Sequence, residues 1–254
     1  MLKIGAQLYT VRMYTQNERD LGRTLERIAK IGYRYVQLSA IGSIPAKAVR
    51  SLCDANGLKI VLTHNPEQRF LCETDALIEE HQIYSCHYAG LGSIAERYRS
   101  AEWLDHFILD FEAPAQKLLD AGIRFMYHNH AFEFMRLPSG ETIMQHLLSH
   151  MPSELMGITA DVYWLQFAGV DIKKWLTENA DRLACVHLKD MTVSGFENRM
   201  AAVGQGNLDI AGILDILIQN GVTEYALVEQ DNCYGESPFV CLKESFDYLQ
   251  KLLY

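Results

Sequence analysis

One sequence pattern recurs along the chain and limits the folds that it can adopt. A helical stretch closes on Gly or Asn, and an apolar, strand-like run follows, as in AKIGYRYVQLS, DANGLKIVLTH, DAGIRFMYHNH and QNGVTEYALVEQ. Glycine stands where a left-handed residue ends a helix, at Gly32, Gly57, Gly122 and Gly221. The variant ENADRLACVHLKD uses Asn179 to Asp181 at the same point. Strands that alternate with helices in this way indicate parallel βα units.

The number of these units predicts a closed barrel. We expect strands to begin at Lys3, Tyr35, Lys59, Tyr84, Arg124, Met156, Leu183 and Tyr225. Eight units without a long linker predict an α/β fold, a (β/α)8 TIM barrel in a single domain over residues 1–254, and such barrels typically need about 250 residues. An open doubly wound sheet would carry a glycine-rich turn after its first strand. Here that turn reads YTVRMYTQNERD, which contains no glycine.

Composition excludes several classes of protein. The chain is 49% hydrophobic and 22% charged, which is enough to bury a sizeable core. A net charge of -9 gives no electrostatic footprint for nucleic acid, and no apolar run is long enough to predict a membrane span. The amino terminus lacks a signal-peptide stretch, so we expect a cytoplasmic protein. Six scattered cysteines without a CxxC pair predict reduced thiols.

Hydrogen-bonding or ionisable side chains stand at the end of every predicted strand. They are Gln7, Tyr9, Gln37, His64, His87, His128, His130, Asp161, His187, Lys189, Glu229 and Asp231. Because the carboxyl ends of barrel strands converge on one mouth, we expect these residues to form a single site. Gathering acids and imidazoles in a partly desolvated mouth is costly unless a metal ion or a substrate organises them.

A divalent metal site is the strongest prediction within this set. Asp161, His187 and Glu229, with Glu133 nearby, supply imidazole and carboxylate ligands. Such a set suits Mn²⁺, Mg²⁺, Co²⁺ or Zn²⁺ and lacks the thiolates that select softer ions. The residues that we expect to bind substrate are Tyr9, His64, His87, His128, His130 and Lys189. Gly204 and Gly206 form a lone GxG, which is a weak signal for phosphate and more typical of a turn.

Five motifs together resemble a known family. They are YHNHAFEF (127–134), ADVYWLQFAGVD (160–171), VHLKD (186–190), VGQGNLDI (203–210) and LVEQD (227–231). They are similar to the xylose isomerase-like TIM barrel superfamily, and more narrowly to its sugar phosphate isomerase/epimerase branch. The resemblance covers essentially the whole chain. It implies metal ligands at Asp161, His187 and Glu229, and a further carboxylate from strand five.

The chain departs from the family pattern at strand five. His128 occupies the place where the family usually has a glutamate, and the nearest acid is Glu133. Either Glu133 folds back as the fourth ligand, or His128 ligates and Glu133 acts on substrate. We expect the first arrangement.

The resemblance implies a sugar isomerase or epimerase that works through an enediolate. Its substrate would be a ketose, aldose or keto-sugar, with or without a phosphate, and Glu133 and Glu229 would transfer the protons. A lyase or dehydratase acting on a keto-sugar or keto-glycoside would use the same residues. A homo-oligomer is compatible with the sequence.

Two further readings are less favoured. Because His128 replaces the family's usual glutamate, the chain could instead be a sugar-binding barrel without catalytic activity. A second branch of the superfamily, the AP endonuclease-like DNA repair enzymes, uses three zinc ions and needs an Asp-x-His pair before the last strand. The segment MTVSGFENRMAAVGQGNLD contains no histidine, and the acidic chain disfavours contact with DNA.

Overall fold

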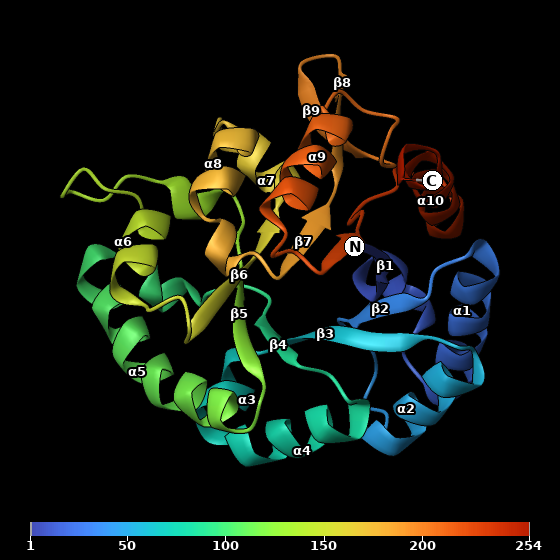
Figure 1. Ribbon diagram of the computed structural model, residues 1–254, viewed down its shortest axis with the longest axis horizontal. Helices are drawn as coiled ribbons and strands as arrows, with labels where there is room; N and C mark the ends of the chain where they lie inside the picture. The colour runs from blue at the N-terminus through green and yellow to red at the C-terminus, as the bar shows by residue number, and fades with distance from the viewer. Residues whose placement is uncertain (1, 254) are drawn as a thin grey trace.

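Eight parallel strands close into a barrel at the centre of the molecule (Figure 1). The computed structural model describes residues 2–253, so Met1 and Tyr254, the ends of the predicted domain, lie outside the described residues. The barrel strands are β1 (Lys3–Gln7), β2 (Tyr35–Leu38), β3 (Lys59–Asn65), β4 (Tyr88–Leu91), β5 (Arg124–His128), β6 (Met156–Asp161), β7 (Cys185–Leu188) and β10 (Tyr225–Val228). Strand β1 pairs with both β2 and β10, which completes the ring. The predicted (β/α)8 TIM barrel is confirmed.

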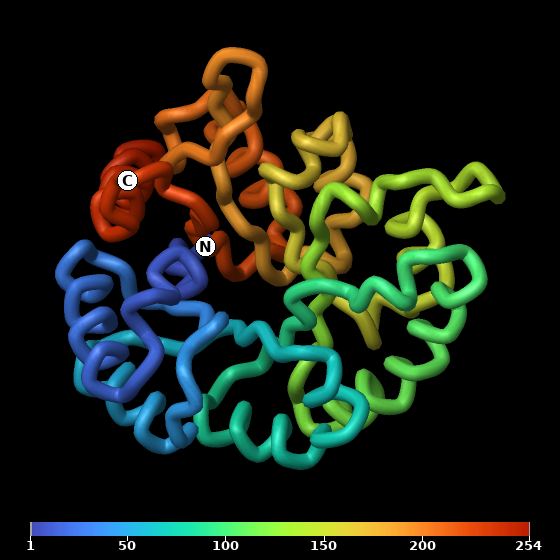
Figure 2. Tube along the Cα trace, turned by 180° about the vertical axis from the view of Figure 1, so that it is seen from behind, coloured from blue at the N-terminus to red at the C-terminus, as the bar shows by residue number. Residues whose placement is uncertain are grey.

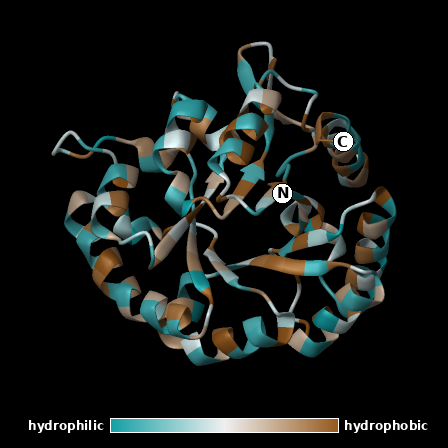
Figure 3. Ribbon diagram, viewed as in Figure 1, coloured by the Kyte–Doolittle hydropathy of each residue, from teal (hydrophilic) through white to brown (hydrophobic). Residues whose placement is uncertain are grey.

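An outer layer of helices surrounds the strands (Figure 2). Its α-helices are α1 (Glu18–Ile31), α2 (Ala46–Ala55), α3 (Glu67–Cys72), α4 (Thr74–Tyr84), α5 (Ala101–Asp120), α6 (Ile143–His150), α7 (Val162–Phe167), α8 (Ile172–Glu178), α9 (Ile210–Asn220) and α10 (Pro238–Leu253). Short 3-10 helices lie at η1 (Leu8–Tyr14), η2 (Glu96–Tyr98), η3 (Phe132–Phe134) and η4 (Ala180–Arg182). The outer helices carry both hydrophobic and hydrophilic stretches (Figure 3), as expected for elements with one face on the strands. No helix within residues 2–253 has the length and apolar character needed to cross a bilayer.

Six of the predicted strand starts match the structure, and two are displaced. Strand β7 begins at Cys185 instead of Leu183, and β4 begins at Tyr88 instead of Tyr84. The larger error arises because α4 continues through Tyr84, burying Leu77, His81 and Tyr84 on one helical face. The apolar composition of the segment predicts a strand, whereas its buried residues follow the helical period.

The interior of the barrel has two levels, which follow from the two-residue period of a strand. A lower apolar cluster contains Leu62, Met126, Cys185 and Leu227. Two residues further along the same strands stand His64, His128, His187 and Glu229. Residues two apart share a face, so the apolar cluster forms the floor on which the polar mouth is built.

A two-stranded hairpin that the sequence did not predict follows β7. Strands β8 (Asp190–Ser194) and β9 (Glu197–Ala201) pair antiparallel and project from the barrel (Figure 1). At its base the buried Asp190 carboxylate accepts hydrogen bonds from the backbone N–H groups of Met191, Gly204, Gly206 and Leu208, at 2.8, 2.9, 3.0 and 3.1 Å. The GxG turn therefore binds the protein's own carboxylate. A side chain at Gly206 would collide with that carboxylate.

We predict that Asp190→Ala lowers the free energy of unfolding by at least about 3 kcal/mol, because four backbone donors lose a charged acceptor. Urea unfolding measures the change. The matched control is Asp215→Ala, at an exposed position on α9, which should stay within about 0.5 kcal/mol of the parent. Equal stabilities for the two variants would contradict this role of Asp190.

Candidate functional site

A cavity of about 440 Å³ opens at the carboxyl ends of the barrel strands. Its walls come from Tyr9, Ser39, His64, Asn65, Pro66, Gly92, Ser93, His128, His130, Lys189, Glu229 and Asp231. Predicted substrate contacts thus lie around one space, at Tyr9, His64, His128, His130 and Lys189.

Four side chains at the base of this mouth form a group that could hold a metal ion. His128, Asp161, His187 and Glu229 each offer one ligand atom, and these atoms lie within 4.8 Å of one another. All four side chains are buried. They come from β5, β6, β7 and the end of β10, and Asp161 and His187 are direct partners across the β6–β7 ladder. The closed sheet therefore brings together three residues that the sequence proposed as ligands.

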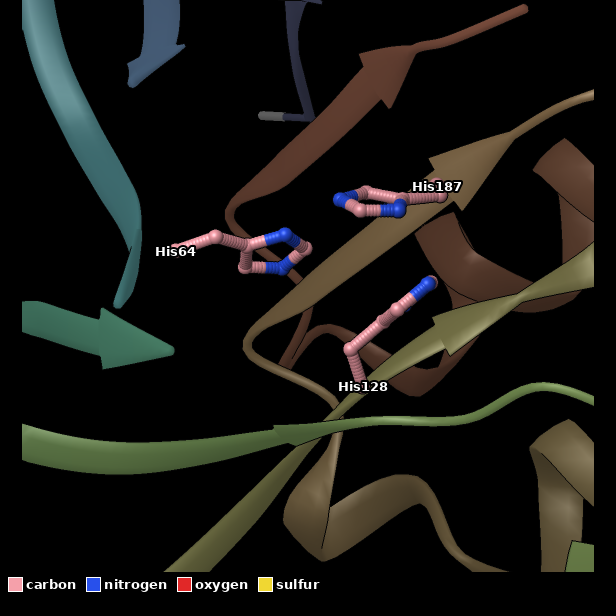
Figure 4. A group of neighbouring side chains, drawn as sticks. All are labelled: His64, His128 and His187. Atoms are coloured by element: carbon pink, nitrogen blue, oxygen red, sulfur yellow. The ribbon is translucent and has the colours of Figure 1, made fainter. Parts of the chain in front are cut away.

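The two imidazoles are oriented so that one nitrogen of each remains free. His187 Nε2 lies 2.7 Å from Gln37 Oε1, which can only accept, so Nε2 carries the proton and Nδ1 carries the lone pair. His128 Nδ1 likewise donates to the Thr159 carbonyl, at 3.3 Å, which leaves Nε2 free. The rings of His128 and His187 lie 4.6 Å apart between centroids, and His128 reaches toward His187 (Figure 4). Such outer hydrogen bonds are typical of metal-ligating histidines.

The donor atoms of the group lie near the spacing that a divalent ion requires. His187 Nδ1 lies 3.0 Å from Glu229 Oε2 and 3.8 Å from Asp161 Oδ2, and all three side chains are buried. The two carboxylate oxygens also contact the Lys189 ammonium. Metal–ligand bonds of about 2.0–2.2 Å place neighbouring ligands roughly 3–3.5 Å apart. A lone pair facing carboxylate oxygens is repulsive unless a cation lies between them. Burial alone would lower the pKa of His187, but the carboxylates of Glu229 and Asp161 raise it, so the group favours a positive charge. The residues present fit a divalent cation.

Lys189 supplies a fixed positive charge beside this group. Its buried Nζ lies 2.9 Å from Asp161 Oδ2, 2.9 Å from Glu229 Oε2 and 3.0 Å from Asp231 Oδ1. Burial would lower the pKa of Lys189, but the three carboxylates hold it well above its usual range. Three carboxylates and one ammonium leave a net charge of -2, which one divalent cation would neutralise. Burial and, after it, the Glu229 carboxylate raise the pKa of Asp231 to about 6.

The structure does not place Glu133, the predicted fourth ligand, in the four-residue group. Its carboxylate accepts a hydrogen bond from the Tyr127 hydroxyl at 2.9 Å and from the His130 backbone N–H at 2.8 Å. Glu133 belongs neither to the four-residue group nor to the cavity wall. Its carboxylate is therefore not placed to contact a substrate in the cavity, as the predicted catalytic role requires. The residues after β5 coil into η3, which turns Glu133 back against the barrel. Burial raises the pKa of Glu133 to about 7. His128, predicted to bind substrate, is the fourth member of the group with Asp161, His187 and Glu229.

The remaining predicted residues divide between the two ends of the barrel. His64 and His130 line the cavity, and burial lowers the pKa of His64 to about 3 and that of His130 to about 4, so both imidazoles are neutral. His64 also forms a second close group with His128 and His187 (Figure 4). His87, predicted to bind substrate, does not line the cavity. Because β4 begins at Tyr88, His87 lies at the amino end of that strand, exposed and 3.2 Å from the Gly122 carbonyl.

Residues without a predicted role also shape the site. Asp231 lines the cavity and contacts Lys189, and its spacing of two from Glu229 was the available signal. Gln37 lies within β2, one residue before its end, and its contact with His187 gives it a place in the site. Asn129 Oδ1 accepts from the Asp161 backbone N–H at 2.9 Å. Ser39, Asn65 and Ser93 line the cavity from segments whose sequence gave no signal.

The comparisons with known proteins agree with this geometry. A family model described as the xylose isomerase-like TIM barrel matches residues 25–252. A sugar phosphate isomerase/epimerase from Parabacteroides distasonis superposes with a TM-score of 0.80 at 23% identity, covering 98% of this chain and 93% of that one. An L-ribulose 3-epimerase gives 0.77 at 12% identity, with coverages of 100% and 95%. A D-allulose 3-epimerase from Methylomonas sp. gives 0.73 at 14% identity, with coverages of 99% and 98%. No curated protein matches the sequence significantly. At these identities the similar structures support the fold alone.

We predict that Lys189→Met lowers the free energy of unfolding by about 3–5 kcal/mol in metal-free buffer, because it removes the ammonium from a buried ion cluster. Added Co²⁺ should then stabilise the variant more than the parent, since the ion replaces the missing charge. Urea unfolding with and without Co²⁺ measures both effects.

The matched control for this prediction is Lys173→Met. Lys173 forms an exposed ion pair with Asp209, so its loss should change stability little. A Lys189 variant that is as stable as this control, or that gains no more from Co²⁺ than the parent does, would contradict the electrostatic role of Lys189.

Proposed function

The chain belongs to the xylose isomerase-like TIM barrel family, and on that basis we propose that it is a divalent-metal-dependent isomerase or epimerase of a small carbohydrate. One observation carries the proposal. Donor atoms of His128, Asp161, His187 and Glu229 converge within 4.8 Å of one another in the closed mouth of the barrel, and Glu229 also lines the cavity.

The four-residue group would hold the ion through one atom from each of His128, Asp161, His187 and Glu229. When bound, a divalent ion polarises a carbonyl and an adjacent hydroxyl, which acidifies the C–H bond between them and stabilises the enediolate. The net charge of -2 on Asp161, Glu229, Asp231 and Lys189 would balance the charge of a divalent ion.

Glu229 is the residue that we assign as the base. Its carboxylate lies at the cavity wall, and its contacts with the Lys189 ammonium and with His187 hold it in place. Burial would raise the pKa of Glu229, but Lys189 and His187 lower it, so the side chain is ionised and can accept a proton. Glu133 cannot complete the exchange, because its carboxylate is turned away from the cavity.

Asp231 is our choice for the second proton-transfer group. It lines the same cavity and contacts the same ammonium as Glu229, so the two carboxyls serve one side of a substrate. Proton return on that side interconverts an aldose and a ketose. Return on the opposite side, for which the cavity-lining His64 and His130 are the candidates, would invert a carbon instead.

The rest of the cavity suits a sugar. Its size falls within the range of small-molecule sites. Ser39, Asn65 and Ser93 offer hydroxyl and amide groups to substrate hydroxyls, and the Tyr9 ring offers an apolar face to C–H groups. We therefore propose a carbohydrate as the partner of this site.

A second candidate is a lyase or dehydratase that acts on a keto-sugar or keto-glycoside. It would use the same site, because Glu229 and Asp231 line one cavity and either carboxyl could face a leaving group. Elimination from the same enediolate needs one base and a donor to the leaving group. Glu229 and Asp231 could fill those roles.

We predict that Glu229→Gln lowers kcat by about 10²–10⁴-fold, because the amide cannot accept the proton. Activity is followed on the best substrate of the panel below, and circular dichroism checks that the variant is folded. Glu197→Gln, exposed on the hairpin, is the control and should retain full activity. Activity of the Glu229 variant within threefold of the parent would remove Glu229 from the mechanism.

Proton exchange distinguishes the two candidate reactions. Purified protein with Co²⁺ is incubated in D2O with a panel of ketoses, keto-sugars and keto-glycosides, and NMR follows each compound. We expect deuterium at the carbon beside the carbonyl, with no loss of a substituent. Release of a leaving group would establish elimination instead. Binding of sugars without any exchange would contradict both reactions and identify a sugar-binding barrel.

A further inference from the structure

The donor group contains as much nitrogen as oxygen. His128 and His187 supply imidazoles, and Asp161 and Glu229 supply carboxylates. We propose that His128 makes this centre selective for the nitrogen-preferring ions Zn²⁺, Co²⁺ and Ni²⁺ over Mg²⁺ and Mn²⁺. The inference rests on the proposed metal-dependent function and names the class of ion that the site takes.

Hydrogen bonds fix the orientation of both imidazoles in the absence of an ion. The Gln37 amide oxygen and the Thr159 carbonyl fix the tautomers of His187 and His128, and each ring keeps one unprotonated nitrogen. His64 adds a third neutral imidazole within 4.8 Å of the other two. Figure 4 shows the three rings gathered from different strands. Imidazole suits Zn²⁺ and Ni²⁺, whereas Mg²⁺ and Mn²⁺ favour oxygen.

Beyond the two carboxylates of the group, the nearby oxygen donors are already engaged. The Lys189 ammonium holds both oxygens of Asp231, at 3.0 and 3.1 Å. Glu133 is held by Tyr127 and His130. Mg²⁺ requires nearly octahedral oxygen coordination. Among residues 2–253, the carboxylates nearest the group cannot supply it without breaking these contacts.

The test is a comparison of ion affinities for the metal-free protein and for His128→Glu. Equilibrium dialysis with elemental analysis, without substrate, gives dissociation constants for Zn²⁺, Co²⁺, Mn²⁺ and Mg²⁺. Most mixed sites bind Zn²⁺ more tightly than Mn²⁺, so the informative quantity is the change in the Zn²⁺ to Mn²⁺ affinity ratio. We expect His128→Glu to lower that ratio by at least about 10–100-fold. The visible absorption of bound Co²⁺ should change as a nitrogen ligand is lost.

Two further variants keep the inference falsifiable if His128→Glu does not fold. His128→Gln removes the nitrogen without adding charge, so Zn²⁺ affinity should fall while Mg²⁺ affinity stays the same. His150→Gln, exposed on α6 and remote from the group, should leave every affinity unchanged. An unchanged ratio in His128→Glu, or unchanged Zn²⁺ affinity in His128→Gln, overturns the selectivity inference alone. If no divalent ion binds the parent protein, the metal-dependent function fails as well.

Discussion

The hydrogen bonds that join β10 to β1 and to β7 close the ring, and the chemistry of the site depends on that closure. They set Leu227 beside His187, which brings the next inward-facing residue of that strand, Glu229, to the His187 ring. Asp161 reaches the same point from the β6–β7 ladder. These residues are far apart in sequence, and no local element could hold them together. The backbone ladder therefore fixes the donor positions before any ligand is present.

Within that frame, charge organises the mouth. Asp161, Glu229 and Asp231 crowd around Lys189, and one ammonium cannot balance three carboxylates. The free lone pair of His187 adds to the negative potential, because Gln37 holds its proton on the opposite side of the ring. Such a cluster favours a divalent cation and, beside it, a substrate on which negative charge develops. Binding and catalysis would then rely on the same arrangement of charges.

The fold and the centre of the site could be predicted because both follow from short-range periodicities. The helix–glycine–strand phrase marks each βα unit, and the two-residue period places His187 and Glu229 inside the barrel. The failures lie where tertiary contacts decide the outcome. The position of the Glu133 carboxylate depends on how η3 coils and on the Tyr127 hydroxyl. The position of His87 depends on where α4 ends. Asp190 holds the base of the β8–β9 hairpin by accepting hydrogen bonds from the backbone of Gly204 and Gly206. No local sequence pattern predicts these contacts.

The histidine at strand five is better explained as changed chemistry than as lost chemistry. A barrel that only binds sugar has no need to turn a buried imidazole lone pair toward two carboxylates, and such an unsatisfied polar atom costs about 1–3 kcal/mol. This chain does so at His187, where Gln37 keeps the lone pair directed toward Glu229 and Asp161. His128 is oriented in the same way, by the Thr159 carbonyl. The residue that replaces the glutamate is therefore built into the donor group. Glu133, which could have restored the oxygen ligand, is bound elsewhere. On the proposed function, a histidine in place of glutamate would alter two properties together, the ion that the centre favours and the group that completes proton transfer.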